Sequence, residues 1–540
     1  MKRSTIVAGT ALIFVLIIFY YSQTGVFFYI GNLNSEEREN IQKLREVISL
    51  TKNYYVDKVD WNEATEQAIN GMLHSLDPHS VYFNPEEAEL NDESFDGKYQ
   101  GIGIQYDVIE GYINVISVIP DSPSEKAGVY AGDVIVSIDG ESAFGIRNAE
   151  VPKKLKGLKG TKVNIGIKRS GVDEELKFDI VRDEVPIFTI NTSFMANDST
   201  GYIWLNKFMS ITADKLESEL IRMEKLGMKQ LIIDLRNNGG GFLAQAVRVV
   251  GKFISGHQKV VYTKGRIKEF SNEQYTDDYG KSIDRDYPLI LLINQSSASA
   301  SEIVAGALQD YDRALIVGER SFGKGLVQNE FSLNDDSRLR LTISKYYTPS
   351  GRLIQRPYKN KSLTEYYDLD NFDLDSLNRE PEYDSTQVYY TKNGRKVYGG
   401  GGIKPDVEIP YEDYSKSPQL TRKLFEKRLF FEVASEFSSE HKYFKDHFDD
   451  FLTYKIKEKW FTRLKNAAIE KNIDFHNDLW EQDRAYIENR LKAEIARNIW
   501  SQNEFYRIML QYDNQFDSAL GLFDEARKIQ QSIRHIEAKN

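Results

Sequence analysis

The chain has 540 residues, a formal net charge of −11 and no cysteine. This length exceeds what one hydrophobic core holds and indicates about three or four folded units. The acidic balance argues against a general nucleic-acid binder, and the lack of cysteine excludes disulfides, thiolate metal sites, a cysteine nucleophile and a lipidated N-terminal cysteine.

The N-terminus predicts a membrane anchor. Lys2 and Arg3 precede an apolar run that starts at Ile6. Extended through residues 26–30, this run is long enough to span a bilayer core, which takes about 20 residues. Because no small-x-small cleavage site follows, a retained anchor is favoured over a cleaved signal. We therefore expect residues 1–31 to be a transmembrane anchor or signal segment, with the rest of the chain outside the cytoplasm.

Four further regions follow in chain order. Residues 32–93 carry apolar residues at helical spacing and predict a helical region. Residues 94–184 change to short strand candidates separated by Gly, Pro and Asp, which predicts a β-rich module. Residues 185–410 alternate strands and helices, a pattern typical of an α/β core with a largely parallel sheet. Residues 411–540 predict charged, amphipathic helices, so the fold class is multidomain α/β.

Within the α/β region, apolar runs locate the individual elements. The strand candidates are 202–208, 231–235, 289–293, 314–317 and 339–346, and the helix candidates are 212–226, 242–254 and 300–310. In the β-rich module, residues 124–128 suggest a short helix that ends at a glycine. Within residues 411–540, the ranges 420–437 and 483–499 predict two longer helices.

A Tyr- and Asp-rich insertion occupies residues 357–399, and we expect a surface loop or small hairpin. Its aspartates at 368, 370, 373 and 375 suggest calcium at first sight. The spacing lacks the glycine at the sixth position and the glutamate at the twelfth position of an EF-hand loop. A solvated acidic loop is therefore the better interpretation, and we predict no metal site.

A cluster of small and hydroxyl residues, Asn294–Glu302, follows the apolar strand 289–293. A helix is predicted to begin directly after it, at residue 300. Such a strand-to-helix corner can hold one serine exposed beside free backbone N–H groups. Lys324 follows Ser299 by 25 residues and is the candidate base. The pattern indicates a Ser/Lys hydrolase.

The choice of base favours lysine over histidine. His257 is the sole histidine between residues 201 and 400, and no sequence pattern ties a histidine to Ser299 in a Ser-His-Asp triad. Lysine can act instead if burial lowers its pKa from about 10.4 towards about 7. Lys324 lies between two glycines, where a tight backbone can aim it inward. Gln328 is a neutral amide that could orient the amine without restoring its charge.

An oxyanion hole is the third requirement of such a site. The segment Asp234–Gly241 follows an apolar strand and opens a predicted helix, so its glycines allow close backbone approach. Either Gly239 or Gly240, together with the backbone N–H of Ala300, could bind the oxyanion.

A nucleotide site competes for the same residues. Gly318–Lys324 matches the first seven positions of a P-loop, but Gly325 stands where Ser or Thr must hold Mg²⁺. Strand-like sequence then follows where a P-loop needs a helix. We therefore predict no nucleotide and no other cofactor.

Taken together, these motifs resemble the carboxyl-terminal processing peptidases, or tail-specific proteases, a Ser/Lys peptidase family (S41) with a PDZ domain and a crotonase-like α/β core. The resemblance runs from about residue 36 to residue 410. It is carried by Ser75–Tyr82, Gly101–Ile104, Asp234–Gly240, Ser297–Glu302, Gly318–Gly325, Tyr347–Arg352 and Gly400–Asp406.

The resemblance implies roles for the catalytic residues: Ser299 is the nucleophile, Lys324 the general base and Gln328 the residue that positions the lysine. It also implies that residues 94–184 form the PDZ domain. The loop that would capture a substrate's C-terminal carboxylate, while the tail adds as a strand, consists of Gly101, Ile102, Gly103 and Ile104. From the residues alone, a hairpin glycine pair explains this loop equally well. Asp77, Pro78 and His79 are expected to form a structural turn.

The implied function is a serine endopeptidase of the bacterial periplasm, anchored to the inner membrane, that cleaves proteins after binding their C-terminal tails. The alternative is a catalytically silent PDZ scaffold or adaptor. Expected partners are protein or peptide substrates with exposed C-termini and the membrane, but no nucleic acid. The sequence leaves open whether the chain forms a homo-oligomer or binds an adaptor protein, and whether residues 411–540 serve either purpose or cover the active site.

Overall fold

A computed structural model describes residues 34–537 except 110, 120, 121, 131, 148, 149, 170, 171, 173, 360, 368–386, 413 and 474–476. The anchor predicted for residues 1–31 and the aspartates at 368, 370, 373 and 375 lie outside these residues. No helix in the described part of the chain is long and apolar enough to cross a membrane. The same part holds no cluster of side chains suited to a metal ion.

The chain divides into two units, Met1–Ser75 and Leu76–Asn540. The first contains the helices α3 (Ser35–Tyr54) and α4 (Trp61–His74), each started by a side-chain N-cap, Asn34 and Asp60. The second begins with a short strand, β1 (Val81–Phe83), and helix α5 (Pro85–Asp96). The region expected to be helical thus also contains a strand.

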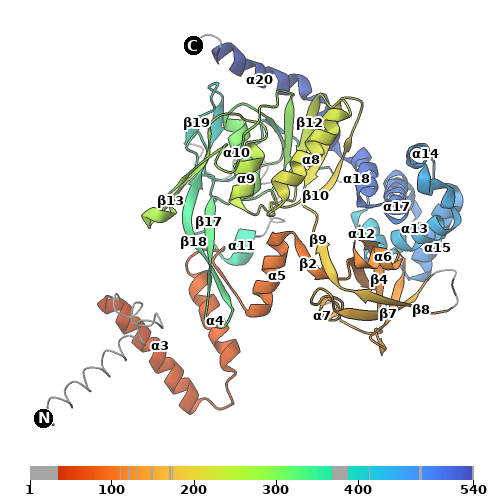
Figure 1. Cartoon of the computed structure of the whole chain (residues 1–540), viewed down its shortest axis with the longest axis horizontal. Helices are drawn as coiled ribbons and strands as arrows, with labels where there is room; N and C mark the ends of the chain where they lie inside the picture. The colour runs from red at the N-terminus through yellow and green to blue at the C-terminus, as the bar shows by residue number, and fades with distance from the viewer. Residues whose placement is uncertain are drawn as a thin grey trace. The chain divides into compact units, whose positions relative to one another are not determined.

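A central sheet of the second unit carries the α/β core (Figure 1). Its strands lie in the order β10 (Ile190–Met195), β11 (Thr200–Leu205), β12 (Gln230–Asp234), β15 (Leu289–Ile293), β16 (Leu315–Gly318) and β21 (Val407–Glu408). All neighbours pair in parallel except β10 and β11. The predicted parallel α/β core is confirmed, with boundaries shifted by a few residues.

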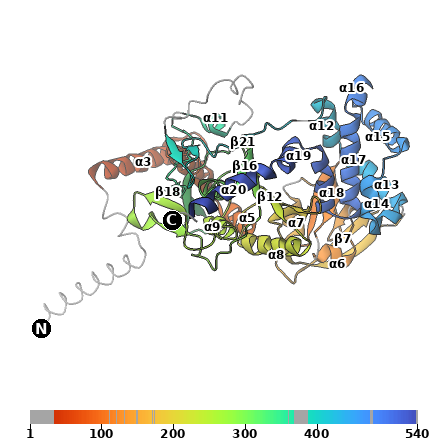
Figure 2. The same cartoon turned by 90° about the horizontal axis from the view of Figure 1, so that it is seen from above.

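Helices cover both faces of the central sheet (Figures 1 and 2). On one face, α8 (Thr212–Lys225), α9 (Leu243–Val250) and α10 (Ala300–Asp310) pack on side chains such as Leu231 and Ile233. On the other, α19 (Asn514–Gly521) and α20 (Phe523–Glu537) pack on side chains such as Ile232. Burial on both faces explains why these strands are apolar runs rather than alternating patterns.

A second, antiparallel sheet contains β17 (Leu326–Ser332), the strand that follows Lys324. It joins β1, β18 (Arg338–Tyr347), β13 (Lys259–Gly265) and β14 (Glu273–Tyr275), and β17 pairs with β18. The insertion forms the short helix α11 (Leu363–Tyr367) and the hairpin β19 (Val388–Tyr390) and β20 (Lys396–Tyr398). The predicted hairpin is therefore present, together with an unpredicted turn of helix.

The β-rich module has its own sheet and core. The strand order is β3 (Ile104–Ile109), β4 (Tyr112–Val118), β5 (Val134–Ile138), β7 (Lys162–Lys168) and β8 (Leu176–Val181), and β6 (Glu141–Ser142) pairs with β5. Two short helices, α6 (Pro123–Ala127) and α7 (Val151–Leu155), accompany it. The predicted glycine stop is confirmed, because Gly128 ends α6 with φ 84°. Strands β2 (Lys98–Gly101) and β9 (Asp183–Pro186) pair with each other where the chain enters and leaves the module.

In the C-terminal part of the chain, the helices from residue 418 to residue 509, called the helical region below, fold around a hydrophobic core of their own. Its helices are α12 (Pro418–Glu426), α13 (Leu429–Glu440), α14 (Phe448–Thr453), α15 (Glu458–Glu470), α16 (Asn477–Gln482), α17 (Arg484–Ile499) and α18 (Gln502–Met509). The single helix predicted over 420–437 is wrong, because Arg428 adopts a left-handed conformation (φ 56°) between α12 and α13. The helix predicted over 483–499 is confirmed as α17.

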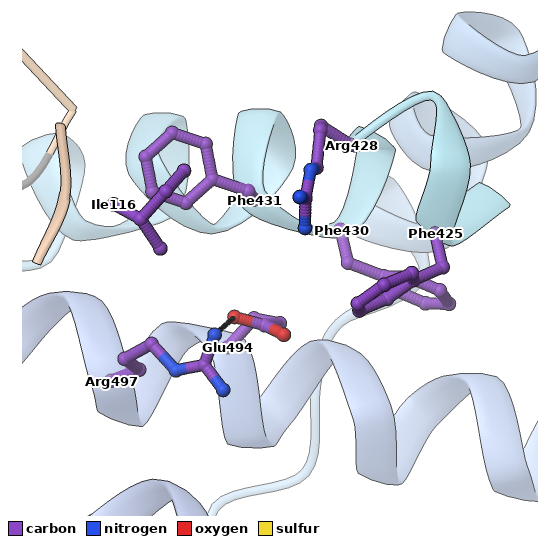
Figure 3. Close-up of a pocket in the computed structure, with 7 residues that line it drawn as sticks. All are labelled: Ile116, Phe425, Arg428, Phe430, Phe431, Glu494 and Arg497. Carbon is purple, nitrogen blue, oxygen red and sulfur yellow. Dashed lines mark ion pairs between the residues drawn. The ribbon is translucent and has the colours of Figure 1, made fainter. Parts of the chain in front are cut away.

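The helical region contacts the β-rich module directly. Figure 3 shows Ile116 of β4 facing Phe431, near the Arg497–Glu494 ion pair of α17. Arg428 also forms an ion pair with Asp107 of β3. These contacts involve the face of the module's sheet that lies away from its own core, because Ile113 and Val115 point inward.

Candidate active site

The sheet topology gathers the three predicted loops at one edge. Strands β12, β15 and β16 are parallel neighbours and end at Asp234, Ile293 and Gly318. Because the carboxyl ends of parallel strands share an edge of the sheet, the loops that follow them converge. The oxyanion loop (Asp234–Gly241), the serine corner (Asn294–Ser299) and the lysine loop (Glu319–Gly325) therefore form one site.

Ser299 occupies a strained position at the start of α10. Its φ of 55° and ψ of −112° fall outside the regions that a non-glycine residue normally adopts. The neighbouring hydroxyls of Ser297 and Ser301 are buried and donate to the carbonyls of Leu235 and Asn238, each at 2.8 Å. Ser299 is only half-buried, so it is the accessible serine of these three.

The oxyanion loop lies against Ser299. Gly240 has φ 98°, and a Cβ there would lie 2.9 Å from the Ser299 Cβ and 2.9 Å from the Ala300 nitrogen. Its amide donates to Asn238 Oδ1 at 2.9 Å. Within the described part of the chain, the amides of Gly239 and Ala300 have no hydrogen-bond partner. Of the two glycines considered for the oxyanion hole, Gly239 is therefore the one with an available donor.

Glu302 connects the serine corner to the lysine loop. Its carboxylate is fully buried and accepts hydrogen bonds from Ser299 N (2.9 Å), Ser321 Oγ (2.6 Å), Gly323 N (2.7 Å) and Lys324 N (2.9 Å). Burial raises the pKa of this carboxyl. Sequence reasoning missed the residue, although a glutamate three residues after a helix-capping serine is a recognisable signal.

Lys324 is held in a largely buried, glycine-flanked position. A Cβ on Gly323 would lie 2.9 Å from Gly402 N, and one on Gly325 would lie 2.9 Å from Gln355 N. Burial is the main cause that lowers the pKa of Lys324 to about 8; nearby Arg340 lowers it further, while Glu302 and Asp77 raise it. No hydrogen bond to its Nζ is found within the described residues.

Gln328 lies on β17, opposite Thr342 of β18. Its amide nitrogen is 3.5 Å from Thr342 Oγ1, and that hydroxyl is 3.0 Å from Asp77 Oδ1. The described residues include no hydrogen bond between Gln328 and Lys324. The amide is therefore connected to Asp77 through a threonine that sequence reasoning did not consider.

The segment Asp77–Ser80 forms the predicted turn, since Asp77 accepts from the amides of His79 (2.8 Å) and Ser80 (2.9 Å). The turn also adjoins the site. His79 contacts the hydroxyls of Tyr366 (3.0 Å) and Tyr367 (3.1 Å). Burial, followed by the charge of Lys324, lowers the pKa of His79 to about 3, which keeps its ring neutral.

The loop Gly101–Ile104 connects two different sheets. Gly101 ends β2, which pairs with β9, and Ile104 begins β3, which pairs with β4, so the hairpin interpretation is wrong. Gly103 has φ 84°, and its carbonyl accepts from Ile119 N at 3.0 Å. In the described part of the chain, β4 is the only strand that pairs with β3, so β3 is an edge strand of its sheet. This edge begins where the loop ends.

The nucleotide interpretation fails on geometry as well as on sequence. Gly318 ends β16, and strand β17 begins at Leu326 directly after the lysine loop. A P-loop requires a helix at this point to hold the phosphates.

Comparisons with known proteins agree with this architecture. The Peptidase family S41 model matches residues 199–359, and a PDZ domain model matches residues 100–180. A model of the activating protease CtpB N-terminal domain matches residues 7–87. Residues 420–501 match a family of unknown function.

Curated relatives match over most of their length. A carboxy-terminal-processing protease of Bartonella bacilliformis is 39% identical over 60% of this chain and 74% of its own. A probable CtpA-like serine protease of Staphylococcus epidermidis is 35% identical over 68% of this chain and 75% of its own. The carboxy-terminal processing protease CtpB of Bacillus subtilis is 35% identical over 60% and 67%. The chain therefore belongs to the carboxy-terminal processing proteases, serine peptidases of family S41 that carry a PDZ domain.

Proposed function

We propose that the protein cleaves polypeptides by a Ser/Lys acyl-enzyme mechanism. The Ser299 hydroxyl loses its proton to the neutral amine of Lys324 and attacks the scissile carbonyl. The amides of Gly239 and Ala300 stabilise the oxyanion, and the protonated Lys324 then gives its proton to the leaving amine. Water, deprotonated by the same lysine, hydrolyses the ester. Gln328 positions the lysine in this scheme.

The observation that carries the mechanism is the shared carboxylate of Glu302. This carboxylate accepts hydrogen bonds from the backbone amides of both Ser299 and Lys324, each at 2.9 Å. The backbones of the two residues are therefore held by one side chain. The pKa of Lys324, lowered to about 8, makes a useful fraction of neutral amine available near neutral pH.

Substrate selection would take place at the PDZ domain. An extended tail can add to the open edge of β3, and the amides of the Gly101–Ile104 loop can bind its terminal carboxylate. We further propose that residues 1–31 anchor the protein in the inner membrane and that the catalytic part faces the periplasm. The basic residues Lys2 and Arg3, followed by the apolar run, support this orientation.

The test uses the detergent-solubilised full chain and an unstructured protein that ends in an apolar tail. Wild type should cleave it, whereas Ser299→Ala and Lys324→Ala should lose at least about 100-fold in kcat. Equal rates for all three would support the silent scaffold instead. Amidation of the substrate's terminal carboxylate should raise KM, and an unchanged KM would refute recognition of the tail.

A separate experiment addresses the anchor. Membranes from cells that express the full chain should retain it through a high-salt wash, and added protease should reach it in spheroplasts but not in intact cells. Release of the protein by salt alone would contradict the proposed anchor.

A further inference from the structure

A buried charge cluster joins the oxyanion loop to the helices that follow the helical region. Arg236 is 7% exposed and pairs with Asp234, with Nε 3.0 Å from both carboxylate oxygens. Asp234 also accepts from the Tyr202 hydroxyl at 2.7 Å. Nη2 of the same guanidinium also donates to Asp234 Oδ2 at 2.6 Å, so the last residue of β12 is one partner of Arg236.

The other partners of this guanidinium come from α19. Arg236 forms a two-pronged ion pair with Asp513, at 3.0 Å and 2.8 Å, and donates to Gln515 Oε1 at 2.9 Å. Gln515 is itself buried and donates to the carbonyl of Ile409 at 2.7 Å. A forked pair of this kind fixes direction as well as distance, since both prongs must align.

Arg236 stands at the start of the turn that carries the oxyanion donor. Asn237 follows with φ 59° and exchanges two hydrogen bonds of 2.9 Å with the Asn294 side chain. Asn238 then accepts from Gly240 N and, at its carbonyl, from Ala298 N at 3.0 Å. The turn is therefore fixed to the serine corner on one side and, through Arg236, to α19 on the other.

We infer that Asp513 and Gln515 are positioning residues for the peptidase reaction. They act through Arg236 to hold the oxyanion loop, so that the Gly239 amide faces the carbonyl attacked by Ser299. The inference rests on the proposed roles of Ser299 and Gly239. It makes a helix far along the chain, α19, part of the machinery that sets the rate.

The experiment compares Asp513→Asn with Asp517→Asn in the full chain. Asp513 is the N-cap of α19 and accepts from Phe516 N at 2.9 Å. Asparagine caps a helix as well as aspartate does, so Asp513→Asn removes the charge but keeps the cap. Asp517 lies in the first turn of the same helix and is exposed, so Asp517→Asn controls for the helix dipole.

We expect Asp513→Asn to lower kcat by about 10- to 100-fold with KM changed by less than about 3-fold, because a small misplacement affects the transition state more than binding. Phosphonylation of Ser299 by a fluorophosphonate, in which the serine oxygen displaces fluoride from phosphorus, should slow by a similar factor. Amide hydrogen exchange at residues 236–241 should speed up about 10-fold. Asp517→Asn should match wild type in every measurement.

Two results would overturn the inference: a kcat for Asp513→Asn equal to that of Asp517→Asn, or a lower kcat without faster exchange at residues 236–241. If thermal melting shows that Asp513→Asn does not fold, Gln515→Met takes its place with an expected 3- to 10-fold loss in kcat. If wild type itself shows no Ser299-dependent cleavage, the proposed function fails. The exchange comparison still decides whether α19 holds the loop.

Discussion

At Lys324, the surroundings oppose a positive charge. Burial is the main cause, Arg340 adds repulsion, and Glu302 and Asp77 act in the opposite direction. The result is a pKa of about 8 instead of the ordinary value above 10. In the proposed mechanism, neutral Lys324 accepts the serine proton, so we expect activity to depend on how much of the neutral form is present.

The pH dependence of catalysis follows directly. Below pH 8 the neutral fraction of Lys324 falls tenfold per unit, so kcat/KM should rise with pH and level off above about pH 8. His79 stays neutral across this range, because its pKa is about 3. Initial rates from pH 6 to pH 10 on a peptide without ionisable side chains provide the measurement. A profile with a midpoint near 6.5 would point to a histidine base instead.

Glu302 should contribute to both stability and rate. Glu302→Gln places an amide NH₂ where backbone donors now meet a carboxylate oxygen, leaving buried donors unpaired. We expect a loss of about 2–4 kcal/mol in the free energy of unfolding and a fall in kcat. Urea denaturation measures the first effect. Glu408→Gln, at a side chain that is 57% exposed, is the control and should change stability by less than about 0.5 kcal/mol.

Among the elements, the oxyanion loop is constrained at one glycine and free at the next. Gly240 needs its positive φ and touches Ser299, whereas a Cβ on Gly239 would meet nothing within 4 Å. We expect Gly240→Ala to lose about 1–3 kcal/mol of stability and most activity, because both strain and a clash arise. Gly239→Ala should unfold at nearly the wild-type denaturant concentration. Equal midpoints for the two variants would contradict this account of the loop.

The elements also show which features the sequence could predict. Strands β12, β15 and β16 were predictable because each is a continuous apolar run, and their parallel order brings Ser299 and Lys324 together. The break at Arg428 was not, since an arginine in a left-handed conformation carries no local signal. Nor could the amphipathic pattern of α19 reveal that its apolar face covers the central sheet, because periodicity identifies a face and not its partner.

For the whole molecule, the last helices join the helical region to the peptidase core. Phe516 of α19 is 7% exposed and packs edge-to-face on Tyr202, at 5.2 Å between ring centroids. We expect Phe516→Ala to cost about 3–5 kcal/mol in the free energy of unfolding, because it leaves a cavity against the sheet. Ile469→Ala, at a side chain that is 59% exposed, should have little effect. Unfolding followed by tryptophan fluorescence would refute the prediction if both variants had the same midpoint.

Helices α19 and α20, which pack on one face of the central sheet, are synthesised long after the strands of that sheet. The ribosome completes the sheet strand at Val407–Glu408 about 100 residues before it completes the helix that starts at Asn514. At a synthesis rate of roughly 5–20 residues per second, one apolar face of the central sheet lacks α19 and α20 for roughly 5–20 s. Under the role inferred for Asp513 and Gln515, a newly made chain therefore carries Ser299 and Lys324 for this interval before α19 can hold the oxyanion loop in place.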